Sequence, residues 1–185
     1  MNVVTFQENS VTRWFGSKFE QLHPMLQDLH RNGGVLRGTV DIKFGQDIAG
    51  WVGKRLAQKL GIPNNHSVYP LEVTISHHND KLYWSRKFGN ESQMLSVFQP
   101  IGKWPEGYWI EQTGFIEMQL TVDLIEGGWY WRVLRIRLGR LKLPLWLFPK
   151  SKAYKRIENG KYCFYVEFRL PILGTIKGSW SLSSW

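Results

Sequence analysis

Apolar and polar residues alternate with a period of two along most of the chain, and the cleanest run covers residues 116–124. There Ile116 begins an apolar series at every second position, and Glu117 begins the intervening polar series. Strict alternation is typical of strands with one buried and one wetted face, and therefore of antiparallel sheets. The pattern recurs at residues 36–44, 71–76, 162–170 and 176–182. We expect about nine or ten strands, and sheets of that size usually curl.

Helical signals are confined to the first 62 residues. Pro24 suits a first helical turn and predicts a helix over 24–31 that Gly33 ends. Asp47 suits the N-cap of a second helix that ends at Gly61. The apolar residues expected to face inward are Leu26 and Leu29 in the first helix, and Ile48, Val52, Leu56 and Leu60 in the second.

Turn residues connect the predicted strands locally. Asn159-Gly160 is the strongest hairpin signal, and Gly127-Gly128 is a second. Asn79-Asp80 and Gly89-Asn90 suit further reversals. No repeat or linker divides the chain, so we expect a single domain over residues 1–185. The predicted fold class is α+β, with N-terminal helices packed on a large curved antiparallel sheet or open β-barrel.

The phase of the alternation changes at Gly139. A one-residue slip at a glycine is typical of a β-bulge, which bends a strand and helps a sheet to curl around a cavity. The slip predicts Leu134, Ile136 and Leu138 as buried before the glycine and Leu141 and Leu143 after it, with Arg135, Arg137, Arg140 and Lys142 on the opposite face.

Basic residues are concentrated in one segment of the chain. The formal net charge is +9, and residues 127–157 hold nine bases and no acid, so the remainder is neutral. A localised positive field attracts anionic partners. The candidate contacts with an anionic surface are Arg132, Arg135, Arg137 and Arg140, and the other bases of the segment are Lys142, Lys150, Lys152, Lys155 and Arg156.

The composition is rich in aromatic residues, with ten Trp, ten Phe and seven Tyr. Such a content predicts either a thick core or a wide apolar pocket. Cys163 is the single cysteine, which excludes an intrachain disulfide and fits a reducing compartment. The first residues lack the pattern of a secretory signal, and no run approaches the about 18 apolar residues of a membrane span. We therefore expect a soluble cytoplasmic protein.

Arg86 is the first candidate for chemistry. It is in phase with Trp84 and Phe88, so its guanidinium is expected to point inward. A buried arginine needs a carboxylate or a bound anion, unless it extends past the aromatic residues to the rim. Glu111 is the preferred partner because it shares a face with Trp109; the alternative is an exposed glutamate on an edge strand. In an apolar pocket the pKa of Glu111 would rise, which suits an acid or base.

Metal and nucleotide chemistry find little support in the sequence. His77 and His78 point to opposite faces of a strand, and no metal-ligand spacing or phosphate-binding loop is present. Cys163 has no adjacent base to activate it. We therefore expect no metal and no cofactor.

The basic segment is compared here with the requirements of two macromolecular surfaces, nucleic acid and an anionic membrane. Residues 129–131 combine aromatic rings with nearby arginines, but most aromatic residues fit core positions, which disfavours nucleic acid. Residues 144–149 form an apolar loop candidate between Lys142 and Lys150. Aromatic and basic residues together suit an anionic membrane surface.

Several short motifs follow one another in a characteristic order. They are Leu22-His23-Pro24, Trp84-x-Arg86-x-Phe88, Glu111-x-x-Gly114, Gly127-Gly128, Pro144 and Leu170-Pro171-Ile172-Leu173-Gly174. In this order the chain resembles a bacterial domain-of-unknown-function family whose members often follow a saccharopine-dehydrogenase-like reductase domain. The resemblance places Arg86 and Glu111 on motif positions. It implies a reductase partner and a setting in redox or lipid metabolism. The chain lacks the dinucleotide fingerprint, so it looks like a stand-alone copy.

Three functions are consistent with these features. The leading one is non-catalytic binding of an amphipathic or apolar small molecule with an anionic end, because curved sheets with aromatic interiors are typical ligand containers. The second is an enzyme or reductase-accessory domain that uses Glu111 and Arg86. The third is a peripheral adaptor for anionic membranes. The expected pocket is bounded by Trp84, Phe88, Trp109 and Met118, with Arg86 or Glu111 inside it or at its mouth.

Overall fold

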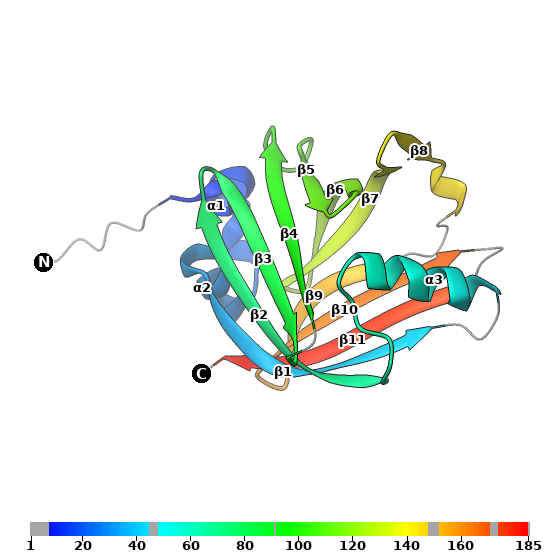
Figure 1. The fold of residues 1–185 in the computed structure, drawn as a ribbon. Helices are drawn as coiled ribbons and strands as arrows, with labels where there is room; N and C mark the ends of the chain where they lie inside the picture. The colour runs from blue at the N-terminus through cyan, green and yellow to red at the C-terminus, as the bar shows by residue number, and fades with distance from the viewer. Residues whose placement is uncertain (1–7, 45–47, 91, 148–151, 171–173, 185) are drawn as a thin grey trace, which may run out of the picture.

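The computed structural model describes residues 8–44, 48–90, 92–147, 152–170 and 174–184. Within these ranges the helices are few and short (Figure 1). They are α1 (Ser10–Phe15), α2 (Pro24–Asn32), α3 (Ile48–Lys59) and the 3-10 helices η1 (Gly16–Gln21) and η2 (Leu145–Leu147).

Antiparallel strands make up most of the described chain. They are β1 (Gly34–Phe44), β2 (Val68–His78), β3 (Lys81–Phe88), β4 (Ser92–Ile101), β5 (Tyr108–Thr113), β6 (Ile116–Ile125), β7 (Gly128–Leu138), β8 (Leu141–Leu143), β9 (Lys152–Glu158), β10 (Lys161–Leu170) and β11 (Gly174–Ser184). The predicted α+β fold, with helices packed on a curved antiparallel sheet, is confirmed.

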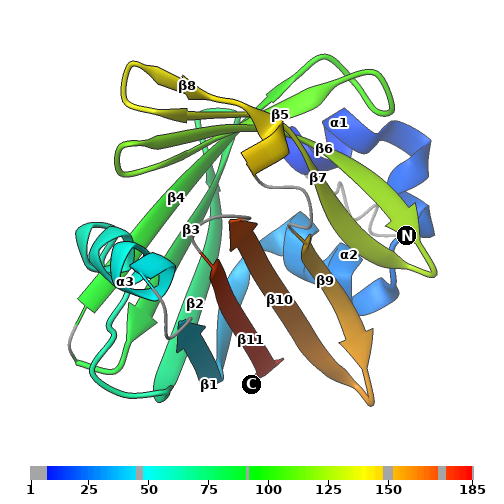
Figure 2. The same ribbon diagram turned by 90° about the vertical axis from the view of Figure 1, so that its right-hand side faces the viewer.

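Strand β7 determines how far the sheet closes. It pairs with β6 along most of its length, and it pairs with β9 only from Trp129 to Trp131. Beyond those residues β7 turns back into β8. The pairing therefore runs as a ring through β1–β7 and β9–β11 at one end of the sheet. At the other end, among the described residues, β7 and β9 separate, and Figure 2 shows β8 turned away from β9.

The helices lie at the two ends of this barrel. α1 packs against β3 and β4, and α2 packs against β2 and β9. α3 packs against β1 and β11, on the right in Figure 1. Pro24 begins α2 and Gly33 ends it, as predicted. α3 also lies where predicted, although Asp47 is outside the described residues. The six residues of α1 were not predicted; Asn9 and Thr12 form its capping box.

The predicted hairpins are largely confirmed. Asn79-Asp80 and Asn159-Gly160 occupy two-residue turns in which all four residues have positive φ. The turn between β6 and β7 is one residue earlier than predicted, because Ile125 pairs with Gly128 and leaves Glu126 and Gly127 in the loop. Turn chemistry is local, and this explains why the sequence locates these reversals well.

The predicted bulge at Gly139 is wrong. Leu138 pairs with Leu141, so Gly139 and Arg140 form a hairpin turn and the phase changes because the chain reverses. A register shift does occur in β7, but at Leu134, opposite residues 119 and 120 of β6.

The register shift and the hairpin turn together change which leucines are buried. Leu134 and Leu141, both predicted as buried, are exposed, whereas Ile136 is buried as predicted. Arg135 is exposed and Arg137 is only partly so. The prediction failed because a hairpin turn and a bulge give the same phase slip in sequence.

Aromatic side chains fill the interior between the helices and the sheet. Trp14, Trp109 and Trp129 are essentially inaccessible to solvent, and Trp14 meets Trp109 edge to face with 5.4 Å between ring centroids. Each aromatic side chain of this kind buries a large area and stabilises the fold by about 2–3 kcal/mol. The aromatic content therefore supplies a thick core, which is one of the two alternatives that the composition predicted.

Candidate functional site

The inner face of β3 carries Arg86 into the barrel. Leu82, Trp84, Arg86 and Phe88 are all buried, and Arg86 is only 8% exposed. The alternation of β3 places the arginine on the face that the three apolar residues require to be buried. The predicted inward orientation of Arg86 is confirmed.

A hydrogen-bonded chain links Arg86 to Glu111 across three adjacent strands. Arg86 Nη1 donates to Ser96 Oγ at 2.8 Å, and Ser96 Oγ lies 2.5 Å from Thr113 Oγ1. Thr113 Oγ1 donates to Glu111 Oε1 at 3.0 Å. The predicted pair is thus connected through two hydroxyl groups, and no direct ion pair joins the two described side chains within 4.0 Å.

Burial sets the proton affinities of both charged groups. It raises the pKa of the Glu111 carboxyl, and the nearby charge of Arg86 and the hydrogen bonds from Ser96 and Thr113 only partly oppose this rise. Burial also lowers the pKa of the Arg86 guanidinium, which Glu111 partly restores. Burial therefore disfavours the charged form of each group relative to water.

Lys155 on β9 adds a second buried cation, and it is 1% exposed. Its Nζ lies 2.7 Å from Nε2 of His30 on α2. It also lies over the ring of Trp129, 3.4 Å from the centroid, and 4.4 Å from that of Trp84. Contact between α2 and β9 brings the two polar groups together.

The electrostatics of this pair favour neutral forms. Burial lowers the pKa of Lys155 well below its ordinary value, the charge of Arg86 lowers it further, and Glu111 opposes both. Burial likewise lowers the pKa of His30, with added effects from Lys155 and His77. A neutral His30 accepts a hydrogen bond from Lys155 through Nε2 and carries its proton on Nδ1.

We call the six side chains that line this region the inner polar cluster. Its two basic side chains, Arg86 and Lys155, outnumber its one carboxyl group, that of Glu111. Around it, the buried indole N–H groups of Trp84 and Trp129 have no hydrogen-bond partner among the described residues. Buried donors are usually paired, so this region has spare capacity for an acceptor. The inner polar cluster consists of His30, Arg86, Ser96, Glu111, Thr113 and Lys155.

The other predicted pocket residues lie on the same interior surface. Phe88 and Trp109 are buried in the core, and Trp84 contacts Phe98 at 5.6 Å between centroids. Met118 is partly buried and faces Glu111 across the β5–β6 ladder. The structure therefore brings all six residues to the inside of the barrel; their contact with a ligand remains a prediction.

Two surface hollows lie elsewhere. The larger, of about 600 Å³, lies between the N-terminus of α1, the end of α2 and the β2–β3 turn. The smaller, of about 240 Å³, adjoins it. No residue predicted to bound the interior pocket lines either hollow.

The larger hollow lies directly behind the inner polar cluster. His77 lines it and lies 3.5 Å from the side-chain amide of Asn9. That amide donates to the carbonyl oxygen of His30 at 3.0 Å. A short polar path therefore connects the surface with the backbone of His30.

The predicted anionic contacts differ from one another in the structure. Arg132 donates twice to Asp123, at 3.1 and 3.2 Å, and Arg137 lies 3.4 Å from Glu117. Arg135 and Arg140 form no ion pair with any described residue. The basic segment holds no acid, but β6 supplies acids from across the ladder, so part of the predicted positive field is neutralised.

Sequence reasoning missed Lys155, His30 and Ser96. Lys155 was counted with the basic segment, although Ala153 and Ile157 share its phase along β9. His30 directly follows the inward-facing Leu29 of α2, where it also reaches the core. These signals are weak because a single polar residue in an apolar phase is usually exposed at an edge.

Comparison with known proteins identifies a family and no function. A family described as Domain of unknown function (DUF4166) matches residues 22–178, which include the whole inner polar cluster. No functionally curated protein matches the chain. None of the described helices has the length and apolar character needed to span a bilayer. The match covers most of the sequence, and the chain belongs to the DUF4166 family.

Proposed function

We propose that the barrel interior binds an amphipathic or apolar small molecule with an anionic end. The observation that supports this most is the burial of Arg86 and Lys155 beside one carboxylate that neither contacts as an ion pair. Isolated buried cations are strongly disfavoured. An anionic group placed between them would supply the missing negative charge.

The surroundings of Lys155 suit the anionic end of such a ligand. The Nζ of Lys155 lies over the faces of Trp84 and Trp129, and a bound anion would raise the lowered pKa of this amine and favour its ammonium form. Their buried indole N–H groups lack acceptors among the described residues and could bind carboxylate or phosphate oxygens. The aromatic lining beyond them, including Phe98 and Trp131 stacked at 5.7 Å, would contact the apolar part.

Native mass spectrometry of the chain purified from cells tests the proposal directly. We expect a bound small acid that denaturation releases. In solution, the fluorescent fatty acid cis-parinaric acid should bind. The affinity of its methyl ester should be lower by about tenfold or more, because charged hydrogen bonds contribute about 1.5–3 kcal/mol.

Variants assign this binding to the inner polar cluster. Lys155→Met and Arg86→Met should each weaken the acid about tenfold or more and leave the ester unchanged. Lys161→Met, at the exposed first residue of β10, is the matched control. Equal affinity for acid and ester in every variant would reject an anion site here.

Glu111 supports a second candidate, proton transfer in an enzyme or reductase-accessory domain. Burial raises the pKa of its carboxyl, although Arg86, Ser96 and Thr113 lie close to it. If a bound acid is identified and turned over, Glu111→Gln should abolish turnover and preserve binding. Retained turnover would remove Glu111 from this role. The reductase partner and the cytoplasmic location remain predictions.

A further inference from the structure

Large apolar side chains are exposed together at the open end of the barrel. Trp146 on η2 is 66% exposed and Leu141 on β8 is 62% exposed. Leu145 and Phe115 are exposed to 42% and 38%. The N–H of Gly139 donates to the carbonyl oxygen of Phe115 at 2.9 Å, which places the β5–β6 turn against the β7–β8 hairpin. We call Phe115, Leu141, Leu145 and Trp146 the apolar tip.

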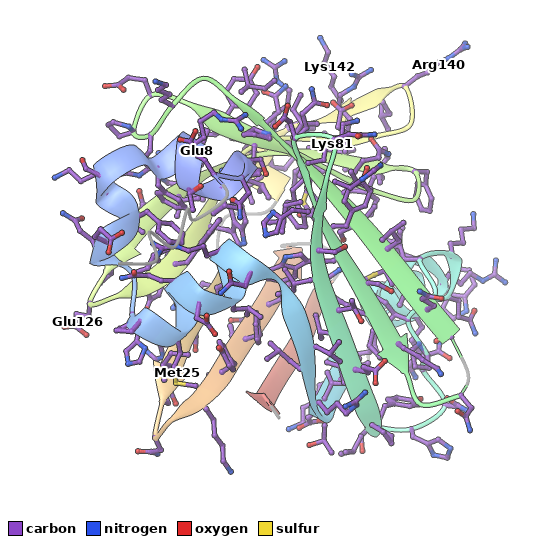
Figure 3. All side chains as sticks on the ribbon, turned by 90° about the vertical axis from the view of Figure 1, so that its left-hand side faces the viewer. Glu8, Met25, Lys81, Glu126, Arg140 and Lys142 are labelled. Atoms are coloured by element: carbon purple, nitrogen blue, oxygen red, sulfur yellow. The ribbon has the colours of Figure 1, made fainter. Side chains whose placement is uncertain are left out.

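Basic side chains surround the apolar tip. Figure 3 shows Arg140 and Lys142 on the β7–β8 hairpin, pointing away from the body of the molecule. Both are exposed, as is Arg135, and none of the three forms an ion pair with a described residue. Asp123 pairs with Arg132 further along β7, and Glu117 pairs with Arg137, which lies opposite Lys142, but no described acid pairs with these three. Uncompensated positive charge is thus concentrated where the apolar side chains protrude.

This combination fits an anionic bilayer better than other partners. Leucine, tryptophan and phenylalanine side chains can enter the boundary between headgroups and acyl chains, while nearby Arg and Lys contact anionic headgroups. A single-strand nucleic-acid site needs several aromatic faces for stacking, and among the described residues of the apolar tip Phe115 and Trp146 are the two aromatic ones. An acidic protein would not require protruding leucines at a hairpin.

We propose that the apolar tip, with Arg135, Arg140 and Lys142, docks the protein on anionic phospholipid membranes. The docking does not depend on the interior site. It would, however, place the end of the barrel where β7 leaves β9 against the bilayer. A ligand with an anionic head and an apolar tail could then come from the membrane itself.

Vesicle flotation with the full chain tests the proposal. The protein should float with phosphatidylcholine vesicles containing about 30 mol% phosphatidylserine, and not with phosphatidylcholine alone. Added salt should weaken the association because it screens exposed charges. Equal association with both vesicles, or with neither, would overturn it.

Charge variants should locate the contact. Arg140→Gln combined with Lys142→Gln should weaken binding about 25-fold, since each basic residue near the surface contributes about fivefold. Lys18→Gln with Lys161→Gln removes the same charge from exposed sites elsewhere and should change binding little. Equal losses in both double variants would mean that net charge, and not this tip, attracts the membrane.

Apolar variants should show that the tip enters the bilayer. Leu141→Ser and Trp146→Ser should each weaken binding about tenfold or more. Ile125→Ser alters an exposed residue at the opposite end of β6 and is the matched control. Unchanged flotation of both tip variants would overturn insertion. Insertion would also be overturned if the tip variants lost binding to single-stranded DNA while their binding to vesicles was unchanged. The tip variants should bind cis-parinaric acid in solution with the same affinity as the wild-type protein. If the wild-type protein does not bind this acid, that result contradicts the interior site alone and leaves the membrane proposal standing.

Discussion

The inner polar cluster and the basic rim of the apolar tip use the same residue types in opposite environments. Inside, Arg86 and Lys155 are buried and make fixed contacts with Ser96 and His30. Outside, Arg140 and Lys142 are exposed and contact no described acid. Water solvates the outer charges, whereas the barrel removes water from the inner ones.

This difference determines what each region can do. A buried charge without a partner raises the free energy of the folded protein, so a ligand that supplies the partner gains affinity. An exposed charge contributes little to folding and remains available for long-range attraction. Substitutions inside should therefore change stability, and substitutions outside should change association.

The largest effect is expected from Glu111→Gln. It removes the described carboxylate whose charge offsets both Arg86 and Lys155. The free energy of unfolding should fall by about 3–5 kcal/mol, because the buried Arg86 guanidinium loses its nearby counter-charge. Urea unfolding measures it, and Glu117→Gln, which removes a partly exposed partner of Arg137, should lower it by about 1 kcal/mol or less. A similar loss in both variants would abolish the distinction between inside and outside.

Ser96→Ala should have the next largest effect. Ser96 is completely buried and accepts from Arg86 while contacting Thr113. Its loss leaves a charged donor without an acceptor and should lower the free energy of unfolding by about 2 kcal/mol. Ser85→Ala is the control on the opposite face of β3, where Ser85 accepts from Gln93 at an exposed position. The interpretation fails if the control loses as much as Ser96→Ala.

His30 should make the protein sensitive to acid. Its folded-state pKa lies below the unfolded value, so between the two values the unfolded chain binds more protons and stability rises with pH. On acidification below about pH 6.5, this residue should remove about 1.4 kcal/mol per pH unit down to the folded-state pKa. His77 has a lowered pKa as well and adds in the same direction.

Unfolding of His30→Leu at several pH values tests the assignment. The difference in stability between wild type and variant should shrink as the pH falls through this window. For Lys155→Met, the difference in stability from wild type should also shrink as the pH falls, but at alkaline pH, because the pKa of Lys155 is also lowered in the folded state. Parallel pH curves for wild type and His30→Leu would contradict the burial of a neutral imidazole.

The smallest effect on stability is expected at the apolar tip. Arg140→Gln with Lys142→Gln should change the free energy of unfolding by about 0.5 kcal/mol or less, since both side chains are exposed and unpaired among the described residues. Their effect on vesicle flotation should be much larger. A destabilised double variant would show that these side chains have a structural role.

Local signals predicted much of the secondary structure. Pro24 and Gly33 mark the two ends of α2, and Asn159-Gly160 forms the predicted hairpin turn. The inward orientation of Arg86 followed from the phase of Trp84 and Phe88. These features depend on residues within a few positions of one another, where capping, turn and alternation rules apply.

Only the tertiary structure decided which polar groups meet. His30 and Lys155 are 125 residues apart in the chain, and they touch because α2 packs on β9. Leu141 looked like a core residue and is exposed, because a hairpin turn and not a bulge follows Leu138. Alternation determines which face of a strand a side chain occupies, but not which strand lies beside it. The pairing of β7 with both β6 and β9 set the neighbours here, and with them the buried charges and the exposed tip.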